Sequence, residues 1–280
     1  MRWKQFLTPV KSIETKKVQA FIDEHSEGTY TLLDVRQPAE YEKSRIPGSK
    51  LIPIGELTSR LGELDRDKPI ITYWAVGGRS RAASQLLSGQ GFKEVYNLKG
   101  GIKSWQGHEA SGPAEMGMIL LTGQETSEEV IILAYGLETG LKDFYTRIDE
   151  TMDDPDISKL LGKLAKIEDN HRQRLFSLYA SLVPGTVDQQ SIETGAGSEI
   201  LEGGFETDTF IEQNRPAMQT PVGVLDVAMM LETQAMDLYL RYAEKSSDDK
   251  AKQIFFDLAN EEKAHLKRLG DLMNEKAAVD

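Results

Sequence analysis

The sequence predicts a two-domain protein in which an α/β domain with a parallel sheet precedes an all-α four-helix bundle. Two observations divide the 280 residues in this way. Residues 1–110 alternate short apolar runs with helical patterns and hold 17 Lys and Arg against 13 Asp and Glu, a net charge of +4. Residues 111–280 show 3.6-residue periodicity and a net charge of −16. We expect a domain at 1–110, a linker at 111–123 and a bundle at 124–280.

The composition narrows the chemistry available to the chain. It contains no cysteine, which excludes disulfides, thiolate metal sites and cysteine nucleophiles. The net charge of −12 is unlike that of nucleic-acid-binding domains. The first residues lack the apolar stretch of a signal peptide, and no apolar run approaches the ~20 residues that span a bilayer. We therefore expect a cytoplasmic protein that binds neither nucleic acid nor a membrane.

Four segments of the first domain predict buried strands. They are short, rich in β-branched or aromatic residues, and bounded by Gly, Pro or Asp. These strands are expected at Tyr30–Val35, Lys50–Pro53, Pro69–Trp74 and Glu94–Leu98. Helices or helical turns are expected at Thr15–Glu24, Ala39–Lys43, Leu57–Leu64 and Arg79–Ser88. The alternation of strands and helices favours a parallel sheet.

The second domain has four long helical segments with recognisable first residues. Thr126 with Glu129 forms a capping-box pattern, and Asp154-Pro155 and Thr220-Pro221 each place an N-cap before proline. The helices are expected at 126–149, 155–180, 221–245 and 248–275. Their joints are short, long and short, with a polar connection at 181–219 in the middle. This pattern is typical of a four-helix bundle with one crossover.

An internal repeat runs through the bundle at an offset of 94 residues. In each half, a Leu-Glu-Thr triplet on the first helix is followed 30 residues later by Glu-x-x-His on the second. The chain has only four histidines, so two at equivalent positions need an explanation. The repeated residues are Glu138, Glu168 and His171 in one half, and Glu232, Glu262 and His265 in the other.

The spacing of these residues suits a metal centre. Side chains at i and i+3 share one helix face, so each Glu-x-x-His directs a carboxylate and an imidazole to one place. Four carboxylates and two imidazoles inside a bundle match two divalent ions and would be costly to bury without them. The alternative is that the glutamates are solvated surface residues and the histidines are coincidental.

The bundle resembles the ferritin-like superfamily and, within it, the rubrerythrin-like di-iron proteins. The resemblance covers about 124–275 and rests on those six residues. It implies two iron ions, with manganese or zinc as alternatives, and reaction with peroxide or dioxygen in protection against oxidative stress. Rubrerythrins typically have a further Glu where this chain has Ala235, and an appended rubredoxin iron bound by cysteines, which this chain lacks. An external protein would therefore have to donate the electrons.

Two tyrosines follow the lone glutamates by two helical turns. Tyr145 and Tyr239 lie seven residues after Glu138 and Glu232, on the same helix faces. We interpret them either as hydrogen-bond donors to metal-bound carboxylates or radical-capable phenols, or as core-packing residues.

The first domain resembles the rhodanese family along nearly all of its length. The matching stretches are Leu32–Arg36 with Glu40-Tyr41, Arg45–Ser49, the loop at 74–80 and Leu98–Ile102 with Trp105. In the family, this loop begins with the cysteine that carries sulfur as a persulfide, and here Trp74 stands in its place. The complete loop is Trp74, Ala75, Val76, Gly77, Gly78, Arg79 and Ser80.

Without the cysteine, the resemblance predicts a catalytically degenerate rhodanese domain. Backbone N–H groups of 76–80 at a helix start could still form an anion cradle. Trp74 supplies no nucleophile, so we expect sulfurtransferase activity to be absent. The domain would then be a docking or sensing module, or a scaffold.

Together these observations favour a di-iron oxidoreductase fused to a degenerate rhodanese domain. One alternative is an iron-binding protein without turnover, which the acidic second domain would suit. Another is a sulfurtransferase or a module that binds sulfur species, the usual function of the first fold. We expect a homodimer, because bundles of this superfamily commonly pair through their helices.

Overall fold

The chain forms two compact units, which divide between Ala114 and Glu115. The computed structural model describes residues 10–76, 78–151, 153–183, 188–195, 200–201 and 205–277. The boundary falls inside the segment that was expected to be a linker. Among the described residues, no helix combines the length and the apolar character that crossing a bilayer requires.

The first unit is built on a five-stranded parallel sheet. Its strands are ordered β1-β5-β4-β2-β3, so β4 lies at the centre. Their bounds are β1 (Lys11–Ile13), β2 (Thr31–Asp34), β3 (Lys50–Leu51), β4 (Ile70–Tyr73) and β5 (Val95–Leu98). This arrangement confirms the predicted parallel α/β class.

Helices cover both faces of this sheet. Ile70 packs in a cluster with Ala83 and Leu87 of α3 (Gly78–Gly89), whereas Ile71 and Tyr73 pack in a second cluster with α1 (Thr15–Glu24). Successive strand residues point to opposite faces, so a buried central strand must be apolar on both. The short α2 (Pro38–Lys43) begins at a Gln37–Glu40 capping box.

Two segments of the first unit need comment. At Leu57–Leu64, where a helix or helical turns are expected, the chain forms turns followed by the 3₁₀ helix η2 (Leu61–Glu63), which confirms the helical turns. Leu57 and Leu64 are buried in the core nevertheless, so the apolar spacing reported burial without a regular helix. Strand β1 was missed because it is short and mostly exposed, and pairing with β5 stabilises it.

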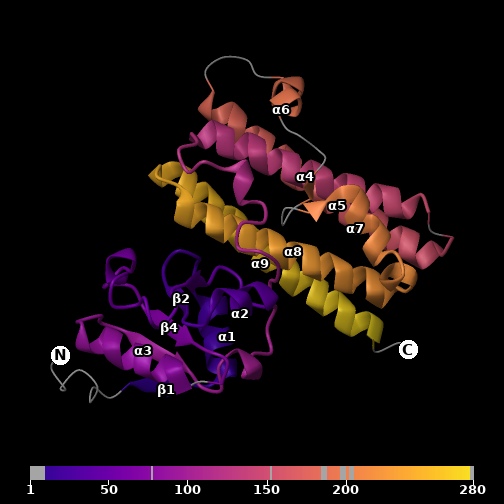
Figure 1. The fold of residues 1–280 in the computed structure, drawn as a ribbon. Coiled ribbons are helices and arrows are strands. Elements are labelled where there is room, and N and C mark those ends of the chain that lie inside the picture. The colour runs from indigo at the N-terminus through magenta and orange to yellow at the C-terminus, as the bar shows by residue number, and fades with distance from the viewer. Residues whose placement is uncertain are drawn as a thin grey trace. The chain divides into compact units, whose positions relative to one another are not determined.

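The second unit contains the four long helices that the sequence predicts (Figure 1). Thr126 caps α4 through the amide of Glu129, Asp154 caps α5, and Thr220 caps α8 through the amide of Gly223. Helices α4 and α5 lie side by side, as do α8 and α9. Their bounds are α4 (Ser127–Asp149), α5 (Pro155–Leu182), α8 (Pro221–Lys245) and α9 (Asp249–Ala277).

The crossover between α5 and α8 has structure of its own. It contains α6 (Gln189–Gly195), a two-stranded antiparallel pair formed by β6 (Ile200–Leu201) and β7 (Phe205–Glu206), and α7 (Thr207–Asn214). Ile192 of α6 is fully buried in one apolar cluster of the bundle, and Phe210 of α7 is buried in another. The crossover therefore adds to the core.

A glycine fixes the loop that follows β4. Gly101 has φ +63°, and a Cβ there would lie 2.0 Å from the carbonyl oxygen of Trp74. The same oxygen accepts a hydrogen bond from the amide of Ile102 at 2.8 Å. Only glycine allows this close approach of two backbone segments.

We therefore predict that Gly101→Ala lowers the free energy of unfolding of the first unit by at least about 2 kcal/mol. All three tryptophans lie at or before Trp105, so denaturant unfolding followed by tryptophan fluorescence reports on this unit. Gly55→Ala is the matched control, since a Cβ there has no neighbour within 4 Å. Equal effects of the two substitutions would contradict the prediction.

Candidate metal centre

The six repeated glutamates and histidines lie on the four long helices. Glu138 is on α4, Glu168 and His171 on α5, Glu232 on α8, and Glu262 and His265 on α9. The structure brings them into two groups of three, and in each group one potential ligand atom per residue lies within 4.8 Å of the others. Each group consists of the three repeated residues from one half of the sequence repeat.

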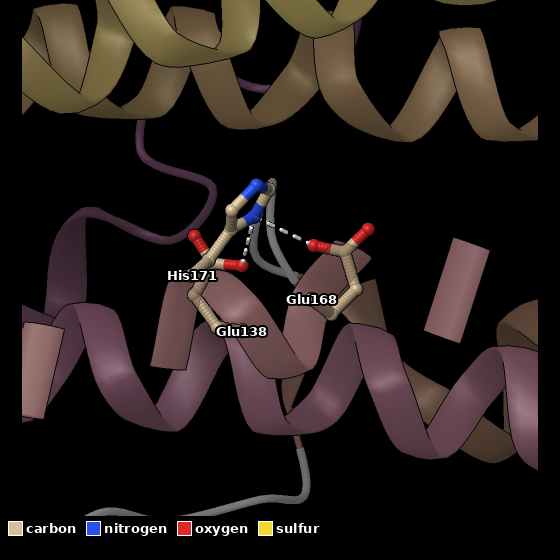
Figure 2. Close-up of side chains that lie close together, drawn as sticks. All are labelled: Glu138, Glu168 and His171. Carbon is tan, nitrogen blue, oxygen red and sulfur yellow. Dashed lines mark hydrogen bonds and ion pairs between the residues drawn. The ribbon is translucent and has the colours of Figure 1, made fainter. Parts of the chain in front are cut away.

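In the first group, the His171 ring lies between two carboxylates (Figure 2). Its Nδ1 is 3.1 Å from Oε2 of Glu138 and 3.0 Å from Oε2 of Glu168. The contact to Glu138 connects α4 with α5, and the contact to Glu168 stays within α5 at the i, i+3 spacing. We name this set the first ligand set.

The second group repeats this geometry. His265 Nδ1 is 3.3 Å from Oε2 of Glu232 and 3.1 Å from Oε2 of Glu262. The rings of His171 and His265 stack with centroids 4.2 Å apart and planes 5° apart, which places the two groups side by side. We name Glu232, Glu262 and His265 the second ligand set.

All four carboxylates are buried, which contradicts the alternative of solvated surface glutamates. Each is at most 2% exposed. The pKa of Glu138 is raised to about 8, chiefly because burial disfavours the charged form and also because Glu168 lies beside it. Burial acts in the same direction on Glu232, but hydrogen bonds with Glu262 and His265 outweigh it and lower the pKa.

The donor set fits divalent metal ions. Carboxylate oxygens and imidazole nitrogens are ligands for iron, manganese and zinc, and ions would supply the positive charge that four buried carboxylates require. His171 and His265 each form ion pairs with two of these carboxylates. The protein therefore contains carboxylate and histidine groups that could bind metal.

The two tyrosines noted in the sequence are core residues. Tyr145 is 1% exposed and meets Phe144 edge to face, with ring centroids 5.4 Å apart. Tyr239 is fully buried and stacks with Phe255 at 6.4 Å. Both pack in the apolar clusters of the bundle, and a role toward a metal-bound carboxylate remains a prediction.

A polar cluster beside the first ligand set was not anticipated. Arg172, next to His171, donates from Nη2 to Oη of Tyr135 at 2.8 Å and lies 3.2 Å from Oε1 of Glu193. Gln189 donates from Nε2 to the same two oxygens. A sequence signal existed, because Tyr135 and Arg172 occupy positions at which the two halves of the repeat differ.

In the first unit, the loop at 74–80 links β4 to α3, as the sequence predicts. Trp74 packs against the core cluster beneath α3, and Cζ of Arg79 lies 4.6 Å from the centroid of its ring. Ala75 is half-buried, and Val76, Gly78 and Arg79 are exposed. Buried Ser80 donates from Oγ to Oδ1 of Asn97 at 2.6 Å. Gly77 lies outside the described residues.

Comparison with known proteins assigns the first unit. The family model for rhodanese-like domains matches residues 17–108. Thiosulfate sulfurtransferase GlpE of Pseudomonas syringae is 32% identical over 100 residues, which cover 36% of this chain and 91% of that protein. The chain belongs to the rhodanese family.

Two further similarities each cover part of the chain. A protein of Bacillus subtilis, YqhL, is 45% identical over 76 residues, or 27% of this chain, and the match spans only 60% of its length. The crystal structure of a rhodanese-related protein from Thermoplasma volcanium is 38% identical, covers 34% of this chain and 89% of that chain, and has a TM-score of 0.31.

The second unit matches a different family. The rubrerythrin model covers residues 223–278, which include most of α8, all of α9 and the second ligand set. The chain is therefore a fusion of a rhodanese-like domain with a rubrerythrin-type, ferritin-like domain.

We predict that metal stabilises the bundle through these ligand sets. Adding ferrous iron without oxygen should raise the melting temperature, since a ligand at 100 times its Kd contributes about 2.7 kcal/mol. The double variant Glu168→Ala plus Glu262→Ala should lose this rise, as measured by thermal unfolding followed by circular dichroism. Glu244→Ala plus Glu275→Ala, which changes two exposed glutamates of α8 and α9, should keep it. A full rise in the first double variant would contradict the assignment.

Proposed function

We propose that the protein is a di-iron oxidoreductase that consumes peroxide or dioxygen at the bundle site. The observation that carries this proposal is the pair of Glu-Glu-His sets held side by side, with all four carboxylates buried. A rubrerythrin match to α8 and α9 supports the same class of protein. Manganese or zinc would fit the same donors.

Each of the two ligand sets would hold one metal ion. Glu138, Glu168 and His171 would hold one ion, and Glu232, Glu262 and His265 the other. When bound, two iron ions supply redox chemistry toward oxygen species. The surrounding apolar clusters exclude bulk water from the carboxylates, and the carboxylates hold or release protons as the charge of the site changes. Tyr145 and Tyr239 would donate hydrogen bonds to metal-bound carboxylates or serve as radical-capable phenols.

The electron source and the assembly state belong to this proposal. The chain has no cysteine and therefore no rubredoxin-type iron, so an external protein would donate electrons. Ala235 occupies the position of the further Glu of rubrerythrins and is fully buried, so that position offers no fifth carboxylate. A homodimer formed through the bundle helices is the expected assembly.

We predict that anaerobically loaded protein contains close to two iron ions per chain. Peroxide should oxidise the ferrous protein rapidly, and added reductant should restore it for repeated cycles. Stopped-flow absorbance measures the oxidation, and metal analysis gives the stoichiometry. A single slow oxidation without recovery would instead favour the second candidate, iron binding without turnover, which the net charge of −16 on residues 111–280 suits.

For the rhodanese-like unit, we propose a docking or sensing role without sulfur transfer. Trp74 lacks a nucleophile, and its ring lies between the core beneath α3 and the Arg79 guanidinium. Its Nε1 is buried and has no hydrogen-bond partner among the described residues. The indole therefore occupies the start of the loop where a sulfur-carrying thiol would need space and access.

We predict that the protein forms no thiocyanate from thiosulfate and cyanide above the uncatalysed rate. In Trp74→Cys, a thiol would stand before the N-terminus of α3, where the helix dipole favours its thiolate, and any activity should appear only in this variant. Trp74→Ser is the matched control, because it opens the same space without a thiol. Turnover by the unmodified chain would establish sulfur transfer as the function of this unit.

A further inference from the structure

The two ligand sets have the same residues and different surroundings. At the offset of 94 residues, Tyr135 corresponds to Met229 and Arg172 to Leu266. In the second half, Leu266 is 4% exposed in an apolar cluster, and Met229 packs against it. In the first half, the same two positions form a polar link between α4 and α5.

The link lies close to the first ligand set on both helices. Tyr135 is on α4, three residues before Glu138, and Arg172 directly follows His171 on α5. The Arg172 guanidinium stacks on the Tyr135 ring, with Cζ 4.8 Å from its centroid, and also bonds its hydroxyl at 2.8 Å. Two contacts between the same side chains fix the spacing and the register of the helices, as the 3.1 Å approach of Glu138 to His171 requires.

The crossover helix α6 completes the link. Its Glu193 accepts from the Tyr135 hydroxyl at 3.2 Å and from Arg172 at 3.2 Å, and Gln189 donates to that hydroxyl at 3.1 Å. Ile192 lies between Gln189 and Glu193 in the sequence, and its fully buried side chain anchors α6 in an apolar cluster of the bundle. Arg172 pairs with Glu193 of α6 at 3.2 Å and, within α5, with Asp169 at 3.3 Å, so its charge has acidic partners on both helices. We name Tyr135, Arg172, Gln189 and Glu193 the α6 clamp.

We infer that the α6 clamp positions the first ligand set, so that the crossover determines how firmly this half of the centre retains its ion. Tyr135 and Arg172 are positioning residues that act through Glu138 and His171. The inference rests on the proposed metal centre. Groups that orient metal ligands typically change metal affinity by about 10- to 100-fold when they are lost.

The test follows each half of the centre separately. The chain has four histidines, so ¹⁵N-histidine labelling of the full-length protein loaded with zinc gives few signals, which single His→Gln variants assign. The rate at which the His171 and His265 signals return to their metal-free positions after addition of EDTA then reports release from each set.

Arg172→Leu places in the first half the residue that the second half has. We expect release from His171 to become about tenfold faster or more, with release from His265 unchanged within about twofold. Tyr135→Phe keeps the ring beneath Arg172 and loses the hydroxyl, so it should give a smaller change of the same kind.

The matched control is Arg174→Leu, which removes an arginine from the same helix. Arg174 is 71% exposed and pairs with Glu261 across the α5–α9 surface at 2.9 Å, and such pairs contribute little. Both rates should stay unchanged in this variant. Equal acceleration at both histidines in Arg172→Leu, or no acceleration at either, would overturn the inference. Unmodified protein whose histidine signals do not respond to zinc would overturn the proposed metal centre itself.

Discussion

The burial of four carboxylates at the centre of the bundle is the constraint on which the second unit depends. A buried ionised carboxylate is costly unless a cation or strong hydrogen bonds compensate for it. Here His171 and His265 pair with these carboxylates, but burial outweighs the effect of His171 at Glu138 and raises its pKa to about 8. The two apolar clusters of the bundle stabilise the fold against this cost, and two divalent ions would offset it.

The same constraint explains why the site could be found from sequence. The ligand residues occupy the same spacing in both helix pairs, so the internal repeat identified Glu138, Glu168 and His171 together with their counterparts. Helix bounds were predicted well where caps are strong, as at Thr220-Pro221 for α8. The polar crossover gave no periodic signal for α6, whose place depends on buried Ile192 and on a contact with Tyr135, more than fifty positions earlier.

In the first unit, the sheet was predictable and its edges were not. Buried central strands such as β4 are apolar on both faces and therefore stand out, whereas β1 exists because β5 provides a hydrogen-bonding partner. The segment Leu57–Leu64 shows a different limit, since its two buried leucines predicted burial but did not distinguish a regular helix from the turns and 3₁₀ helix that form there. The loop at 74–80 was placed correctly because its flanking strand and helix are both strong signals.

The repeat also separates what a metal centre needs from what this chain has added. The shared glutamates and histidines are the potential ligands, and shared leucines such as Leu164 and Leu258 are buried in the core. Residues that differ, such as Tyr135 against Met229 and Arg172 against Leu266, reflect different surroundings of the two ligand sets. These two residues of the first helix pair make the polar contacts with Glu193 of α6. A bundle with equivalent ligands on its two helix pairs is therefore held asymmetrically by its crossover, and exchange at one ligand set need not follow exchange at the other.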